Sequence, residues 1–303
     1  MFIKAFAIIC FCETLLKKIT RRKGIQRPCE FLGIPIKGTK SIKKIAEKIA
    51  ESKSLLCPFT CTDCMKKRHY AKESGMKLAS GICSVWYAGV PYIICQNRLL
   101  ENNLIFKKTS KKIFGNEQYK NFRETKVGDY GRVDHIVGEC DPKSNKILNF
   151  FGLERIAVDT TKTRGLNDAI NDCLSGKIGK KYSFGLNFMH TLKLEIIQVI
   201  LKGKIFEEWE KKYILVLQDH LFNYLQNLTG FSVKDGINDN PIIFCLTALK
   251  YDNSKKRYSL HVKGFKSTDV DLFKTQIRAK KTRIPKLSPF IDRLERKLKK
   301  QKR

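Results

Sequence analysis

Four cysteines, Cys57, Cys64, Cys83 and Cys95, have the side chains and the proximity to share one metal ion. Six, eighteen and eleven residues separate them along the chain. Four thiolates suit a tetrahedral site, and both zinc and iron accept such a ligand set, so the sequence predicts zinc or iron there. A site closed by four protein ligands has no open position for a substrate, so its expected role is structural.

The first ligand of this set is open on spacing alone. Cys61 and Cys64 form a Cys-x-x-Cys pair, so either Cys57 or Cys61 could begin the set. The alternative is that these cysteines bind no metal, because free cysteine is among the residue types most often buried in a core.

Two carboxylates, Asp134 and Glu154, are the second candidate for chemistry. Asp134 lies in a β-prone run at 130–137, and Glu154 is the single acid in an apolar run at 147–158. If these runs are neighbouring strands, both carboxylates can converge on one Mg²⁺ ion, which polarises a phosphate and lowers the pKa of a bound water. The alternative is a pair of unrelated, solvated acids.

The charge of the chain indicates the class of partner. Lys and Arg number 60 against 29 Asp and Glu, so the net charge is +31, and the basic residues run along the whole length. Such a surface attracts phosphate polyanions, and nucleic acid is therefore the expected partner. The alternatives are an anionic membrane surface and a lysine-rich coding bias.

The cysteine count and the first residues bear on location. Eleven cysteines, an odd number without a repeating spacing, indicate reduced thiols and predict a cytoplasmic location. The apolar run at 6–12 is too short to span a bilayer, and no small-residue cleavage site follows it. We therefore expect residues 1–29 to be a lead segment that packs on the body or adds poorly ordered sequence.

Apolar periodicity predicts an α/β protein in four parts. The lead segment precedes a metal-binding module at 30–105 and a core at 106–277. A basic tail at 278–303 surrounds an amphipathic helix marked by Phe290, Leu294 and Leu298.

Within these parts the sequence predicts individual elements. The module should contain a short helix at 42–49 and a hairpin that brings Cys83 and Cys95 to the same ion. The strands of this hairpin are expected at 82–87 and 91–95. In the core we expect a turn at 141–146, a helix at 186–202, and strands at 130–137, 147–158, 213–217, 242–249 and 258–265.

Short motifs surround the four cysteines and give a specific resemblance. They are Cys57-Pro58-Phe59, Cys64-Met65-Lys66, Gly81-Ile82-Cys83-Ser84-Val85 and Cys95-Gln96-Asn97-Arg98, preceded by Phe31-Leu32-Gly33. In this order the motifs resemble those of the NotI-like type II restriction endonucleases, in which they hold one iron ion. The resemblance extends from around residue 30 to around residue 220.

The resemblance implies a fold, a function and a site. It implies a PD-(D/E)XK α/β core and a homodimeric, Mg²⁺-dependent endonuclease that cuts both strands of DNA at a palindromic site. The metal-binding Asp of the family falls on Asp134 and its Leu-Glu strand on Leu153-Glu154, so Asp134 and Glu154 are the expected catalytic residues and Mg²⁺ ligands. The family has no counterpart of Cys61, which favours Cys57 as the first ligand for iron or zinc.

The sequence departs from the family at Ile156, where the family has a Gln that orients the attacking water. Side chains alternate along a strand, so Ile156 shares the face of Glu154 without a hydrogen-bonding group. Arg155 should point to the other face unless a bulge turns it. Either the following helix supplies the polar group, with Lys193 and Gln198 as candidates, or the enzyme is slow or inactive.

An upstream acid, Glu124 or Asp129, is a further candidate for the Mg²⁺ shell. The competing functions are a non-catalytic metal-finger protein that binds DNA, an inactivated nuclease, and an RNA-binding protein that stacks bases on exposed aromatic side chains. Ile156 is the residue that most favours a non-catalytic protein.

Overall fold

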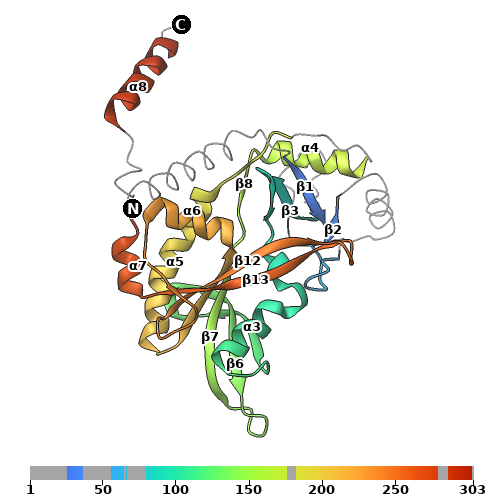
Figure 1. The fold of residues 1–303 in the computed structure, drawn as a ribbon, viewed down its shortest axis with the longest axis vertical. Coiled ribbons are helices and arrows are strands. Elements are labelled where there is room, and N and C mark those ends of the chain that lie inside the picture. The colour runs from blue at the N-terminus through green and yellow to red at the C-terminus, as the bar shows by residue number, and fades with distance from the viewer. Residues whose placement is uncertain are drawn as a thin grey trace, which may run out of the picture.

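The computed structural model describes residues 26–36, 56–64, 66, 80–175, 182–278 and 286–301. The described chain is a mixed α/β structure with a seven-stranded sheet, a four-stranded sheet and a two-stranded ladder (Figure 1). This confirms the predicted α/β class. The predicted helix at 42–49 and the first 25 residues lie outside the described residues.

The large sheet carries both candidate carboxylates. Its strand order is β11-β13-β12-β10-β7-β6-β5. Strands β7, β10 and β12 run parallel to one another, whereas the other neighbours are antiparallel. The bounds are β5 Lys120–Lys126, β6 Arg132–Cys140, β7 Ile147–Arg155, β10 Lys212–Gln218, β11 Lys234–Asp235, β12 Ile242–Asp252 and β13 Arg257–Thr268.

The predicted core strands are confirmed with shifted bounds, and one shift bears on the candidate site. The strand expected at 147–158 ends at Arg155 as β7. Ile156 still donates its backbone N–H to Val216 of β10, but the N–H of Val158 bonds to the carbonyl of Ile93 in the smaller sheet. The chain therefore leaves the large sheet after Ile156, two residues beyond Glu154.

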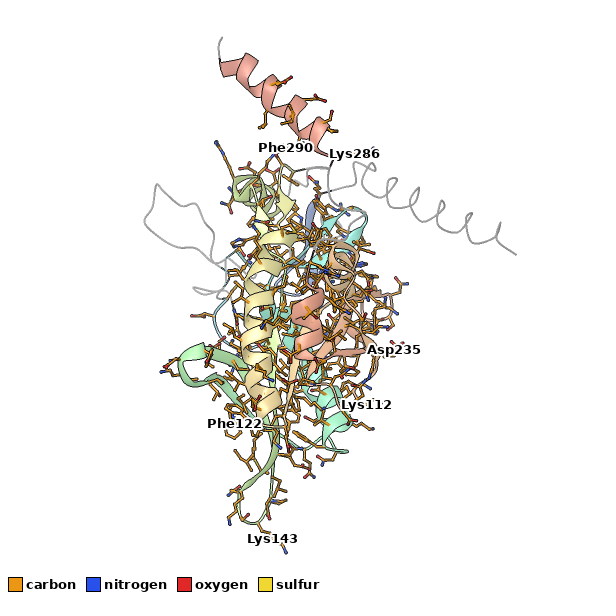
Figure 2. The ribbon with its side chains drawn as sticks, turned by 90° about the vertical axis from the view of Figure 1, so that its left-hand side faces the viewer. Lys112, Phe122, Lys143, Asp235, Lys286 and Phe290 are labelled. Carbon is orange, nitrogen blue, oxygen red and sulfur yellow. The ribbon has the colours of Figure 1, made fainter. Side chains whose placement is uncertain are left out.

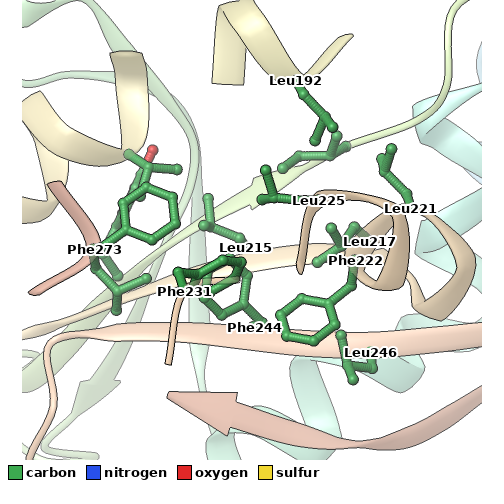
Figure 3. Packing of buried hydrophobic residues seen from close by; sticks show 14 of the residues in the cluster. Leu192, Leu215, Leu217, Leu221, Phe222, Leu225, Phe231, Phe244, Leu246 and Phe273 are labelled. Atoms are coloured by element: carbon green, nitrogen blue, oxygen red, sulfur yellow. The ribbon is translucent and has the colours of Figure 1, made fainter. Parts of the chain in front are cut away.

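Three helices cover one face of the large sheet. They are α5 (Phe188–Glu208), α6 (Asp219–Thr229) and α7 (Val270–Gln276), and Figure 2 shows α5 and α7 side by side. The predicted helix at 186–202 is thus confirmed and extends further. Their apolar side chains meet the sheet in one buried cluster, in which the rings of Phe222, Phe231, Phe244 and Phe273 contact one another (Figure 3).

A glycine lets α5 lie close to the sheet. A Cβ atom on Gly152 of β7 would stand 2.4 Å from Cζ of the buried Phe206 of α5. Because real Cβ atoms do not approach a ring so closely, only glycine accommodates this contact. The contact fixes the distance between α5 and β7 two residues before Glu154.

The other face of the sheet is covered by η1 (Gln96–Asn103) and α3 (Leu104–Ile113). Leu99, Leu100, Ile105 and Phe106 are buried there with residues of β7, β10 and β12. Between 99 and 120 the residue pattern is mixed and rich in lysine, so it predicts no helix there. A kink at Glu101 and Asn102 interrupts the helical backbone and hides the period.

The smaller sheet holds the predicted cysteine hairpin. Its order is β2-β1-β3-β4, with bounds β1 Arg27–Phe31, β2 Ile34–Pro35, β3 Ile82–Tyr87 and β4 Val90–Ile93. Strands β3 and β4 pair antiparallel, as predicted. We call this sheet, with residues 56–64, Lys66 and Cys95, the cysteine lobe. Helix α4 (Thr163–Leu174) packs against it. In the sequence this helix lies between the short strands β8 (Thr160–Thr161) and β9 (Gly185–Leu186).

A buried arginine joins the cysteine lobe to the large sheet. Arg98 of η1 is fully buried and forms ion pairs with Glu30 of β1 at 3.0 Å and with Glu101 at 2.9 Å. It also donates to the carbonyl of Tyr258 in β13 at 3.1 Å, and its guanidinium lies 4.7 Å from the centre of the Phe59 ring. Removing one partner of such a network would leave an uncompensated buried charge, so separating the cysteine lobe from the large sheet is costly.

The predicted C-terminal helix is present as α8 (Leu287–Gln301). It stands apart from the sheets in both views, and Leu287, Phe290, Ile291 and Leu294 are exposed on it (Figures 1 and 2). No helix among the described residues is long and apolar enough to cross a membrane.

Candidate active site

Asp134 and Glu154 lie on adjacent antiparallel strands. His135 of β6 pairs with Leu153 of β7, which places the two acids next to each other one position further along the ladder. The backbone N–H of Asp134 donates to Oε2 of Glu154 at 3.2 Å. The structure therefore brings together the two carboxylates that the sequence singled out.

Glu154 is buried and paired with a lysine from α5. The side chains of Glu154 and Lys202 are 9% and 4% exposed, and Oε1 of Glu154 accepts from Nζ of Lys202 at 2.5 Å. Oε1 also accepts from the hydroxyl of Tyr213 at 3.2 Å. Burial and then the charge of Asp134 raise the pKa of Glu154, and Lys202 opposes that rise. Lys202 thus offsets part of the cost of ionising Glu154.

Asp134 is held through one of its two oxygens. Oδ2 accepts from the backbone N–H of Arg155 at 3.0 Å and from its Nε at 3.2 Å. None of the described residues donates a hydrogen bond to Oδ1. The side chain of Asp134 is 19% exposed, so Oδ1 is the free acceptor of the pair.

Arg155 was predicted to point away from Glu154, on the opposite face of the strand. Its side chain does reach Asn97 of η1, where Nη1 donates to Oδ1 at 3.1 Å. Because β7 ends at Arg155, the same guanidinium also reaches Asp134. The side chain therefore bonds both to Asn97 of η1 and to Asp134 of β6.

Helix α5 supplies the polar groups that Ile156 lacks. Gln198 accepts from Nζ of Lys202 at 2.7 Å, so one of the two predicted helix residues belongs to the site. The other, Lys193, is exposed. Ile156 is 4% exposed and packs in the apolar cluster between the sheet and α5. The sequence reasoning missed Lys202, although a lysine between Val199 and Phe206 on the buried stripe of the helix was a signal.

Glu195 of α5 is a third acid near the pair. Burial, and then the charges of Glu154 and Asp134, raise the pKa of Glu195 to about 7. The two acids proposed upstream are different: Glu124 and Asp129 are exposed, and among the described contacts neither bonds to Asp134 or Glu154. The acid whose charge is coupled to the pair therefore lies on α5.

The four predicted cysteine ligands gather in the cysteine lobe. Cys57 and Cys83 are buried, whereas Cys61 is exposed, which agrees with Cys57 as the first member of the set. Burial is the main cause that raises the pKa of Cys95, and the nearby Cys64 and Cys57 add to it. Cys83 has a pKa raised by burial, by Glu30 and by Cys95.

The arrangement of these thiols is not that of a ligand set. Cys83 Sγ donates to the carbonyl of Gly81 at 3.7 Å. Among the residues that the structure describes, no group of three or more His, Cys, Asp or Glu side chains is placed to hold a metal ion. The metal in the lobe therefore stays a prediction.

The pairing of Glu154 with Lys202 makes a prediction about stability. In Lys202→Met the apolar stem remains and the cation is lost, so Glu154 is left buried and unpaired. We expect the free energy of unfolding to fall by about 3 kcal/mol at pH 8. Glu154 has a raised pKa in the folded state, so the loss should vanish as the pH falls below the unfolded value of about 4.3 and grow as the pH rises above it.

Urea denaturation in EDTA between pH 4.5 and pH 8 measures this dependence. Lys204→Met is the matched control, because Lys204 lies on the same helix but its ion pair with Glu207 is exposed. The control should change the stability little at either pH. An equal loss for Lys202→Met at both ends of the pH range would contradict the account and assign Lys202 a packing role only.

Comparison with known proteins does not assign this chain to a family. No protein-family model matches the chain, and no curated protein matches its sequence.

Proposed function

We propose that the protein is a Mg²⁺-dependent endonuclease that cuts double-stranded DNA. The observation that carries the proposal is the pair of facing carboxylates, Asp134 and Glu154, with Lys202 beside them. Two acids on adjacent strands next to a buried lysine suit phosphodiester hydrolysis, because they can hold a divalent cation at a phosphate. The net charge of +31 favours a polyanionic substrate.

The residues fit Mg²⁺ in their chemistry. Mg²⁺ is usually held by one or two carboxylates and completes its shell with waters and substrate phosphates, so a larger protein ligand set is not needed. Asp134 offers the free Oδ1, and Oε2 of Glu154 accepts only a backbone N–H at 3.2 Å among the described contacts. When bound, Mg²⁺ would polarise the scissile phosphate and lower the pKa of an attacking water.

The side chains of the site divide the remaining work. Lys202 favours the ionised form of Glu154, and Tyr213 and Gln198 fix the positions of Glu154 and Lys202 through the hydrogen bonds described above. Glu195, with a pKa of about 7, is suited to take a proton from the attacking water. Lys202 and Gln198 replace the polar group expected at position 156, so a buried Ile156 is compatible with catalysis.

We extend the proposal to the type of core and to the family. We infer a PD-(D/E)XK core from the carboxylate-bearing antiparallel pair β6–β7, the helix α5 and the parallel strand β10. The cysteine motifs support membership among the NotI-like type II restriction endonucleases, which act as homodimers on palindromic sites. The basic tail supplies non-specific contacts to phosphates.

A digest of long phage DNA tests the function. We expect discrete bands with Mg²⁺ and none with EDTA, because the cut depends on the cation held by the carboxylates. Asp134→Asn should lower the rate about 100-fold or more, since it removes a charged ligand worth several kcal/mol in the transition state. The exposed Asp129→Asn is the matched control and should cut normally.

The outcome also separates the competing functions. Intact DNA that shifts on a gel would indicate a DNA-binding protein without catalysis. Cleavage by Asp134→Asn at the normal rate would contradict the proposed site. Tighter binding to single strands than to duplex DNA would favour RNA or another single-stranded ligand.

We propose further that the cysteine lobe holds one structural iron or zinc ion. The support is that Cys64 and Cys57 raise the pKa of Cys95 and that Cys95 raises the pKa of Cys83, where a bound cation would offset both effects. Metal analysis of the purified protein should find about one ion per chain. Cys83→Ser should lose that ion, and the exposed Cys61→Ser should retain it. Equal metal content in both variants would contradict this set of ligands.

A further inference from the structure

The last cysteine motif is connected to the carboxylate pair by one side chain. Asn97 stands two residues after Cys95, and its backbone N–H donates to the Cys95 thiol. Its side-chain Oδ1 accepts from Nη1 of Arg155 at 3.1 Å. Arg155 in turn donates from Nε to Oδ2 of Asp134 at 3.2 Å. Three consecutive contacts thus lead from the cysteine lobe to the candidate site.

The position of Asn97 is fixed by its neighbour in the sequence. Arg98 is fully buried and bonds to Glu30, Glu101 and the carbonyl of Tyr258. Because these partners come from β1, η1 and β13, the backbone at Asn97 is held by both the cysteine lobe and the large sheet. Asn97 therefore offers Arg155 an acceptor at a defined place.

Arg155 is largely buried, with 7% of the residue exposed, and its guanidinium is hydrogen-bonded through both Nε and Nη1. With Nη1 on Asn97 and Nε on Asp134, the planar group has one orientation, and it occupies only Oδ2 of the carboxylate. Without Asn97 the group would be free to turn and to compete for the second oxygen of Asp134.

We infer that Asn97 is a positioning residue: through Arg155 it holds Asp134 so that Oδ1 stays open to a divalent cation. The inference rests on the proposed function, because it concerns the ion that Asp134 and Glu154 would bind. It predicts that the cysteine lobe sets the affinity of the carboxylate pair for that ion, although none of the described cysteines hydrogen-bonds to the pair.

Titration calorimetry with Mn²⁺ on the full chain, without DNA, tests the inference. Binding that is present in the wild type and lost in Asp134→Asn reports the carboxylate site. Asn97→Leu keeps the size of the side chain and removes the acceptor, so we expect Mn²⁺ to bind about 5- to 10-fold more weakly, within the range of one lost hydrogen bond. Asn97→Asp retains the acceptor oxygen and should bind within about 2-fold of the wild type.

Two further variants and one kinetic readout complete the experiment. Gln96→Leu is the matched control, because Gln96 is the exposed neighbour in the same motif and should leave Mn²⁺ affinity unchanged. Arg155→Lys keeps the charge but cannot span Asn97 and Asp134, so it should repeat the loss if Asn97→Leu does not fold. In DNA cleavage, Asn97→Leu should need more Mg²⁺ for half-maximal rate while kcat at saturating Mg²⁺ stays close to that of the wild type.

The possible failures are distinguishable. Unchanged Mn²⁺ affinity in Asn97→Leu, with binding still abolished in Asp134→Asn, would overturn the inference and leave the proposed function standing. A lower kcat with an unchanged Mg²⁺ requirement would also overturn it. No Asp134-dependent Mn²⁺ binding in the wild type would overturn both the proposed function and the role of Asn97.

Discussion

Two carboxylates stand next to each other in a largely buried part of the sheet, and their mutual repulsion is the constraint on which the site depends. A pair of acids in such surroundings stays ionised only if cations offset the cost of burial. Lys202 forms a buried ion pair with Glu154, and Arg155 forms an ion pair with Asp134. Each cation takes one oxygen, and at least one oxygen of the pair is left for another ligand. The same contacts therefore also leave Oδ1 of Asp134 without a donor among the described residues, as the proposed metal ion requires.

Both cations owe their positions to contacts outside the site. Lys202 is delivered by α5, which approaches β7 because Gly152 accepts the ring of Phe206 against its backbone. Arg155 is fixed by Asn97, which the buried Arg98 network holds between the cysteine lobe and the large sheet. The helical layer and the cysteine lobe thus act on opposite sides of the same carboxylate pair. This gives the lobe a role in the site without any chemistry of its own.

The sequence predicts the parts of this arrangement that depend on local pattern. Alternating and apolar runs marked the strands that carry Asp134 and Glu154, and the turn between them fixed their pairing. Lys202 was missed because a lysine on an apolar helix stripe is usually solvated, and only the position of Glu154 across the interface makes it a partner. The contact between Asn97 and Arg155 spans 58 positions of the chain, so no periodicity could reveal it. The kink in η1 hid a helix for a similar reason, since its backbone is fixed by the buried partners of Arg98 and Glu101.

The central claim is that Asp134 and Glu154 together hold a divalent cation. Anomalous diffraction from crystals soaked in Mn²⁺ tests it most directly, because the signal locates the ion without reference to activity. The account predicts a peak within bonding distance of Oδ1 of Asp134 and a carboxylate oxygen of Glu154, absent from Asp134→Asn crystals. Full Mn²⁺ occupancy elsewhere, with no peak between these two carboxylates, would contradict it.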